Sequence, residues 1–176
     1  MGGLWGGREV VGGGRGGGGG GGGMGEGWGV TDGYDVRLCD IKEEFAEGGK
    51  KKIEKNINFL VNKEKITAEK GAEILGKIKT GLKDICTDYD LVVEVCPEVL
   101  AIKQATFKEL MNIVPKDCMF ASNTSSLSIT EIGAGLDRPM IGMHFFNPAD
   151  RMKLIEVIAG GNTPAEMVET IKKISV

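Results

Sequence analysis

Short apolar runs alternate with helix-like segments from residue 34 onward, and this alternation constrains the fold of the 176-residue chain more than any other feature. Strands are expected at 34–39, 91–95, 118–122, 140–146 and 154–158. Two charged helices are expected within 42–79, broken near 62–67, and another at 102–111. Thr163, Pro164 and Glu166 predict a capping box that starts a last helix. The pattern indicates an α/β, doubly wound, Rossmann-like domain with a mostly parallel sheet and a two-helix insertion after its second strand.

The N-terminal segment has a different composition. Residues 1–33 hold 19 of the 29 glycines, including an unbroken run from Gly16 to Gly23. Such a segment has few apolar side chains whose burial could offset the backbone entropy that glycine loses on folding. We expect 1–33 to be disordered or to form a degenerate first βα unit, and 34–176 to form the folded domain.

Charge and composition exclude several classes of protein. The formal charge is −3 and no clustered basic run precedes the helical region, so no nucleic-acid partner is expected. No apolar stretch approaches the roughly 20 residues that span a bilayer, and the glycine-rich N-terminus lacks a signal-peptide core, so a cytoplasmic protein is expected. The four cysteines show neither C-x-x-C spacing nor a histidine cluster, so they are expected to be reduced thiols and no metal site is expected.

The only histidine, His144, lies near several polar residues that suit acid/base chemistry. Histidine is the side chain whose ordinary pKa, about 6.5, best suits proton transfer at neutral pH, and a carboxylate can hold its ring. Ser125, Asn147 and Glu156 are candidate partners. A lone histidine beside two phenylalanines is also typical of a core or surface position.

Each candidate partner has a structural alternative. Ser125 could cap a helix that starts near Ser126 or Ser128. Asn147 precedes a proline and could open a turn, and Glu156 could be an edge-strand carboxylate facing water.

Polar residues also collect where the expected strands end. Asp40, Glu98, Ser122 to Ser125 and His144 all follow or end apolar runs. In doubly wound sheets the carboxyl ends of the strands form the ligand cleft. Asp40 fits the acidic residue that binds a cofactor ribose, and an aspartate there favours NAD over NADP; alternatively, it caps a helix at Ile41.

Several longer segments carry a specific resemblance. The segments YDVRLCDIKEEF, DLVVEVCPEVLAIK, FASNTSSLSITEI, GMHFFNP and MKLIEVI resemble the nucleotide-binding domain of the L-3-hydroxyacyl-CoA dehydrogenase family, which includes bacterial 3-hydroxybutyryl-CoA dehydrogenases. The resemblance runs from about residue 33 to 176. It implies an NAD-dependent oxidoreductase that interconverts L-3-hydroxyacyl-CoA and 3-oxoacyl-CoA in fatty acid β-oxidation or butyrate and butanol metabolism.

The resemblance also implies roles for individual residues. His144 would take the hydroxyl proton, Glu156 would hold and charge-stabilise its ring, and Ser125 and Asn147 would lie beside the substrate 3-oxygen and the nicotinamide. Further carried-over positions are Asp40, Glu98 and Lys103 for NAD, and Asn56 and Lys63, with Ser125, for the acyl-CoA substrate.

In the family a helical domain follows this one, makes most of a homodimer interface and closes over the acyl-CoA. The sequence stops before that domain, so we expect it to be absent here, the homodimer to be doubtful and this chain to show little or no turnover. Two alternatives stay open: a non-catalytic fragment that binds NAD or CoA, and a related hydroxy-acid dehydrogenase.

The glycine turn that would hold the NAD pyrophosphate is ambiguous in register. Counting back from Asp40 selects Gly17, Gly19 and Gly22. Matching a methionine selects Gly20, Gly22 and Gly25. A third register takes residues 9–11 as the strand and Gly12, Gly14 and Gly17 as the turn.

All three registers leave a helix with several interior glycines, each costing about 0.5–1 kcal/mol relative to alanine. We therefore predict that NAD binds far more weakly than is usual for the family. Titration calorimetry of the 176-residue chain with NAD measures this directly, and an affinity typical of the family would contradict it.

Overall fold

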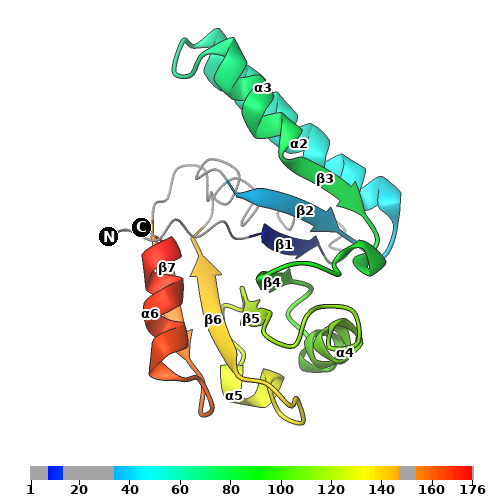
Figure 1. Ribbon diagram of the computed structural model, residues 1–176, viewed down its shortest axis with the longest axis vertical. Coiled ribbons are helices and arrows are strands. Elements are labelled where there is room, and N and C mark those ends of the chain that lie inside the picture. Colours follow the sequence, from blue (N-terminus) through cyan, green and yellow to red (C-terminus); the bar gives the residue numbers. More distant parts are fainter. Residues whose placement is uncertain (1–7, 14–33, 147–153, 176) are drawn as a thin grey trace.

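The computed structural model describes residues 8–13, 34–146 and 154–175, and these form one sheet covered by helices (Figure 1). The strand order is β3-β2-β1-β4-β5-β6-β7. The strands are β1 (Arg8–Gly13), β2 (Asp35–Cys39), β3 (Ile78–Gly81), β4 (Leu91–Val95), β5 (Met119–Ser122), β6 (Met140–Phe145) and β7 (Ile155–Ala159). Neighbouring strands are parallel except β6 and β7, which are antiparallel. The predicted doubly wound fold is confirmed.

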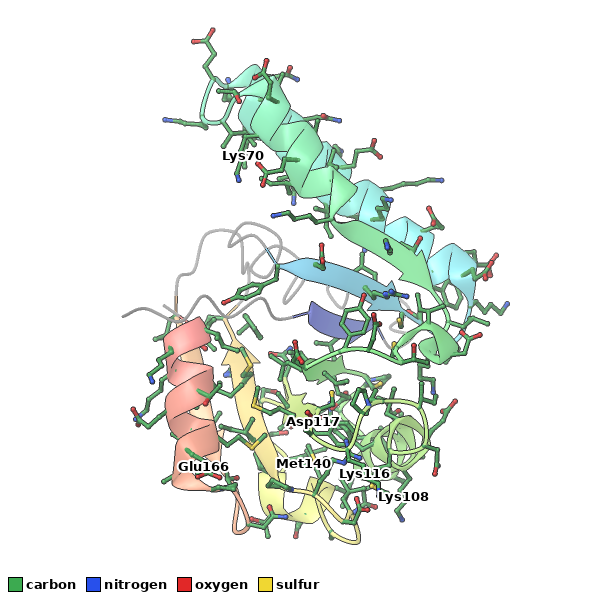
Figure 2. All side chains as sticks on the ribbon, viewed as in Figure 1. Lys70, Lys108, Lys116, Asp117, Met140 and Glu166 are labelled. Carbon is green, nitrogen blue, oxygen red and sulfur yellow. The ribbon has the colours of Figure 1, made fainter. Side chains whose placement is uncertain are left out.

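The helices follow the expected order. They are α2 (Glu43–Asn62), α3 (Ala68–Gly76), α4 (Leu100–Leu110), the short α5 (Ile129–Ile132) and α6 (Ala165–Ile174), with a 3₁₀ turn at Lys83–Ile85. Helices α2 and α3 form the two-helix insertion after β2. In Figures 1 and 2 this hairpin, which carries Lys70, projects past the β3 edge of the sheet.

Two details of the sequence prediction were wrong. Residues 78 and 79 belong to strand β3 and not to a helix, because Ile78 pairs with Val36 in a parallel ladder and is buried there. The capping box before α6 does not form. The N-cap is Pro164, and the Thr163 hydroxyl instead accepts from Gly160 N–H and donates to the Met140 carbonyl.

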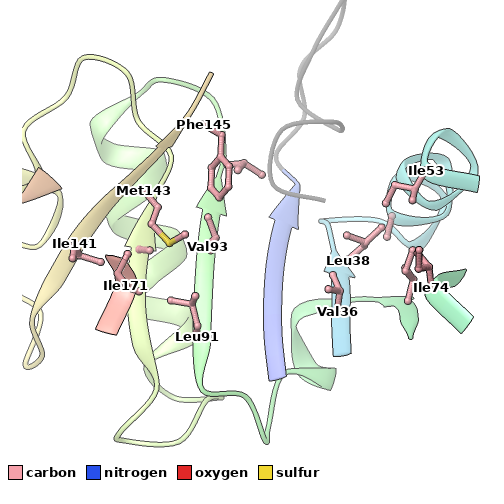
Figure 3. Close-up of a cluster of buried hydrophobic side chains, with 14 of the residues drawn as sticks. Val36, Leu38, Ile53, Ile74, Leu91, Val93, Ile141, Met143, Phe145 and Ile171 are labelled. Carbon is pink, nitrogen blue, oxygen red and sulfur yellow. The ribbon is translucent and has the colours of Figure 1, made fainter. Parts of the chain in front are cut away.

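The core has two layers, one on each face of the sheet. The larger joins α2, α3 and α6 to one face, and Leu91, Val93 and Val95 supply the β4 side chains (Figure 3). The other joins α4 and α5 to the opposite face, where Val92 lies. Because side chains alternate along a strand, Glu94 must face the α4 side with Val92. The side of the sheet on which Glu94 lies therefore decides which groups can pair with its carboxylate.

No helix among the described residues is long and apolar enough to cross a bilayer.

Gly142 in β6 is a sensitive packing position. A Cβ there would lie 2.9 Å from Ile158 Cβ on the edge strand and 3.0 Å from Ile129 Cδ1 on α5. We predict that Gly142→Ala lowers the free energy of unfolding by about 1–3 kcal/mol, because both neighbours must shift to accept the methyl group.

Gly48 in α2 provides the control, since a Cβ there meets nothing within 4 Å. Gly48→Ala should stabilise the protein by about 0.5–1 kcal/mol, because alanine is the better helix former. Urea unfolding of both variants decides the matter, and equal midpoints would contradict the packing argument.

Candidate active site

The carboxyl ends of the parallel strands form one edge of the sheet, and its centre is a switch point. Strand β1 lies between β2 and β4, so the chain winds outward in opposite directions from β1. In sheets of this type ligands bind outside the carboxyl ends of the strands at such a switch point. Most of the residues discussed below lie on this edge.

Asp40 follows the last residue of β2 on this edge. Its Oδ1 accepts the N–H of Ile41 at 2.6 Å. Burial raises the pKa of this carboxyl group, opposed by the Ile41 hydrogen bond and by Lys83. The helix-capping alternative is wrong, because Lys42 is the N-cap of α2. Asp40 Oδ2 has no partner among the described residues, so it is available for a ligand.

A buried ion pair lies under the end of β4. Glu94 and Lys103 are each 1% exposed, and Lys103 Nζ lies 2.9 Å from Glu94 Oε1. The ammonium also donates to the Cys96 carbonyl at 3.0 Å. The Ser122 hydroxyl donates to Glu94 Oε2 at 2.7 Å, and Cys96 N–H donates to Glu94 Oε1. Every charge in this group is therefore satisfied inside the protein.

Glu98 connects that pair to the loop after β5. Its Oε2 lies 3.4 Å from Lys103 Nζ. Its Oε1 accepts from the backbone N–H groups of Ser125 and Ser126, at 3.1 and 3.0 Å, and from the Thr124 hydroxyl. Burial of Glu98 acts to raise its pKa. The hydrogen bonds from Thr124 and Ser126 and the charge of Lys103 outweigh burial and lower the pKa to about 2. The carboxylate thus holds the loop in shape.

His144 and Glu156 face each other across the only antiparallel pair of strands in the described sheet. They are direct partners in the β6–β7 register, and His144 Nδ1 lies 2.8 Å from Glu156 Oε2. The His144 side chain is 21% exposed and Glu156 is 52% exposed. Glu156 does lie on an edge strand, as the alternative supposed, but its carboxylate is engaged with the imidazole. An Nδ1–H held in this way leaves Nε2 as the proton acceptor.

The remaining predicted site residues are distributed as follows. Ser125 is exposed in the loop between β5 and α5, where Ser128 and not Ser125 caps the helix. No hydrogen bond joins Ser125 to His144 in the described part of the chain. Asn147 lies outside the described residues, as do Gly17, Gly19 and Gly22. The first strand is described at Arg8–Gly13, which agrees with the strand of the third glycine register.

Asn56 and Lys63 are not brought to His144. Asn56 is exposed on α2 and Lys63 is exposed at its C-cap. Helix α2 packs on β2 and β3, at the opposite end of the sheet from β6 and β7 (Figure 1). Asn56 and Lys63 are seven residues apart, with Phe59 between them on the same helical face. Phe59 is 57% exposed, and Lys63 Nζ lies 5.9 Å from its ring centroid.

Sequence reasoning missed Glu94 and Asn123. Glu94 was hidden inside an apolar run, although a carboxylate in a buried strand requires a cation and Lys103 follows nine residues later. Asn123 Oδ1 accepts the Phe145 N–H at 2.8 Å, a contact between segments 22 residues apart. No local pattern in the sequence predicts that contact.

The fold and this edge together define an α/β dinucleotide-binding domain with a histidine–carboxylate pair at its ligand edge. Residues 19–175 match the family described as 3-hydroxyacyl-CoA dehydrogenase, NAD binding domain. The chain belongs to this family, and NAD, the cofactor expected from the sequence, is the one for which the domain is named.

Individual proteins that are similar to this chain point to the same family. The chain is 42% identical over 153 residues to a probable 3-hydroxybutyryl-CoA dehydrogenase of Deinococcus radiodurans, covering 82% of this chain and 54% of that protein. It is 38% identical over 144 residues to the fatty acid oxidation complex subunit alpha of Psychrobacter cryohalolentis, covering 80% of this chain and 20% of that protein. The crystal structure of (S)-3-hydroxybutyryl-CoA dehydrogenase from Ralstonia eutropha superimposes with a TM-score of 0.86 at 30% identity, covering 96% of this chain and 60% of that one. The chain thus spans about half, or less, of the length of these relatives.

The buried ion pair leads to a prediction about the free energy of unfolding. Lys103→Met leaves the Glu94 carboxylate buried without its cation, so we predict a loss of about 3–5 kcal/mol in the free energy of unfolding. Adding Glu94→Gln to that variant should recover part of the loss, because the uncompensated charge is removed. A double-mutant cycle by urea unfolding measures both effects; a loss below about 1 kcal/mol in the single variant would contradict the buried-pair account.

Glu98 makes a pH prediction. Its folded-state pKa of about 2 lies below the ordinary value of 4.5, so the stability it contributes is present above pH 4.5 and is lost as the pH falls toward 2. We predict that the difference in unfolding midpoint between the parent chain and Glu98→Gln shrinks steadily over this interval. A difference that stays constant across the interval would show that Glu98 is not held as an anion by its loop.

Proposed function

We propose that this chain is the NAD-binding and acid/base domain of an enzyme that interconverts L-3-hydroxyacyl-CoA and 3-oxoacyl-CoA. The observation that carries the proposal is the 2.8 Å hydrogen bond between His144 Nδ1 and Glu156 Oε2 at the ligand edge of an NAD-binding fold. The two relatives named for 3-hydroxybutyryl-CoA dehydrogenase activity support this substrate class.

The proposed chemistry assigns one task to each group. Glu156 accepts a hydrogen bond from His144 Nδ1 and stabilises the positive charge that the ring acquires. His144 Nε2 removes the proton from the substrate 3-hydroxyl, and returns it in the reverse direction. Ser125 and Asn147 are proposed to donate hydrogen bonds to the 3-oxygen as negative charge develops there. Bound NAD supplies the hydride acceptor.

The described residues fit the cofactor at two points. Asp40 Oδ2, at the end of β2, has no hydrogen-bond partner among the described residues, and a ribose hydroxyl could donate to it there. Glu98 stands at the end of β4 with its loop. Because the Lys103 ammonium is engaged by internal acceptors, we propose that Lys103 serves the cofactor by holding Glu98. Strand β1 supports a glycine turn at Gly12, Gly14 and Gly17 over the register of Gly17, Gly19 and Gly22.

The proposed acyl-CoA contacts lie on the helical hairpin. Asn56, Phe59 and Lys63 share one exposed face of α2, and they combine an amide, an aromatic surface and a cation. These groups suit the base and the phosphates of a CoA nucleotide. The thioester would then extend from this face to His144, so the two groups of site residues would bind different ends of one long substrate.

The test is the oxidation of NADH driven by acetoacetyl-CoA, compared in the parent chain, His144→Ala and Glu156→Gln. Loss of a positioned acid/base group lowers the rate by about 10²–10⁴-fold, so His144→Ala should abolish any turnover that the parent chain shows. Glu156→Gln keeps the shape of the side chain but removes its charge, and should lower kcat with little change in the KM for NADH. Lys63→Ala should raise the KM for acetoacetyl-CoA alone.

Three outcomes would contradict the proposal. Unchanged turnover in His144→Ala excludes the acid/base role. Equal use of free 3-hydroxybutyrate and its CoA ester favours a related hydroxy-acid dehydrogenase, because a free acid has no CoA for Asn56 and Lys63 to bind. NAD and CoA binding in calorimetry without any turnover favours the binding-only reading.

A further inference from the structure

The end of β6 that carries His144 extends beyond its parallel neighbour. The β5–β6 ladder pairs Phe120 with Met140, Ala121 with Ile141 and Ser122 with Gly142, and stops there. On the other side, β7 continues to pair as far as Phe145. His144 therefore lies on a stretch of strand that is supported by a ladder on one side only, and that side is the edge strand of the described sheet.

Asn123 fills the missing position on the other side. Its side-chain Oδ1 accepts the Phe145 N–H at 2.8 Å, and its own N–H donates to the Glu94 carbonyl at 2.8 Å. One residue thereby links the end of β4 to the end of β6. The amide oxygen takes the place of the backbone carbonyl that β5 would have supplied had it continued.

The loop explains why a side chain is needed for this task. After Ser122 the chain leaves the sheet, and Thr124, Ser125 and Ser126 turn toward Glu98 and are fixed by its Oε1. The backbone of these residues cannot also pair with β6. The departure presents Ser125 at the ligand edge, and Asn123 keeps the strand beside it in place.

We propose that Asn123 is a positioning residue for His144, a role that rests on the function proposed above. Phe145 is 3% exposed, so loss of the Asn123 oxygen removes the acceptor of an N–H that is buried in the parent chain. The strand end must then move to satisfy that N–H. Such a shift turns the imidazole of the adjacent residue away from the substrate oxygen, and small misplacements of a reacting group have large effects on rate.

The test compares Asn123→Ala, which removes the acceptor, with Asn123→Asp, which keeps an oxygen at the same place. Asn112→Ala is the matched control, because Asn112 is an exposed asparagine that donates to the Lys108 carbonyl at the far end of α4. Two readouts need no substrate: the hydrogen-exchange rate of the Phe145 amide, and the ring NMR signals of His144. His144 is the only histidine in the sequence, so those signals need no assignment.

Asn123→Ala should speed exchange of the Phe145 amide by roughly ten-fold or more and shift the His144 ring signals. Asn123→Asp should restore slow exchange, and Asn112→Ala should change neither readout. If Asn123→Ala does not fold, Asn123→Ser replaces it in the test. The serine hydroxyl is too short to reach Phe145, so the same changes in amide exchange and ring signals are expected. In the turnover assay, Asn123→Ala should lower kcat and leave the KM for NADH unchanged.

Unchanged Phe145 exchange and unchanged His144 signals in Asn123→Ala would overturn the proposal. So would faster exchange spread evenly over β4, β5 and β6, which would mark a general structural role. The exchange and ring readouts are independent of catalysis. Absence of turnover in the parent chain would therefore count against the proposed function and leave the positioning role to be judged by NMR.

Discussion

The buried carboxylate of Glu94 is the constraint on which the ligand edge depends. Strand alternation turns this side chain toward α4, where water cannot reach it, so the protein must supply its partners. Lys103 from α4 and Ser122 from β5 do so, and the same ammonium reaches Glu98. One internal charge pair thereby fixes the end of β4, the start of α4 and the end of β5 relative to one another.

Contacts that start from this charge pair also hold the loop and the strand end that carry the proposed reacting groups. Glu98 holds the loop that presents Ser125, and Asn123 joins the same loop to the strand end beside His144. The antiparallel β7 then supplies Glu156 from the other side. A histidine 21% exposed is thus held from both sides, and its second ring nitrogen is the one that the proposed function assigns to the substrate.

The proposed division of the site along the sheet also has a physical reason. The switch point at which sheets of this type bind a cofactor lies at the ends of the paired strands β1 and β4, the histidine lies on β6, and the exposed face of α2 lies beyond β3. A substrate with a long nucleotide handle can occupy distant positions of this kind at once. A small hydroxy acid would contact only the region of the histidine.

Much of the fold and part of the site were predictable from sequence, because both follow from local patterns. The apolar run at 91–95 became β4 without change, and the charged helices of the hairpin formed where the periodicity indicated. His144 and Glu156, named as partners from the sequence, do lie in contact through the register of β6 on β7, and their catalytic role stays a prediction. Strand β3 was missed, because Ile78 and its neighbours have no strand signal apart from the ladder with β2.

By itself the sequence determined the alternation of strands and helices, the family, and the one histidine able to carry acid/base chemistry, since these depend on residue type and spacing along the chain. Only the tertiary structure decided that Lys103 is an internal partner of Glu94, that Glu98 holds a loop and that Asn123 supports the histidine strand. Those roles depend on which donors and acceptors lie within about 3 Å after folding. Segments that are distant in the sequence meet there only because strand order and side-chain parity bring them together.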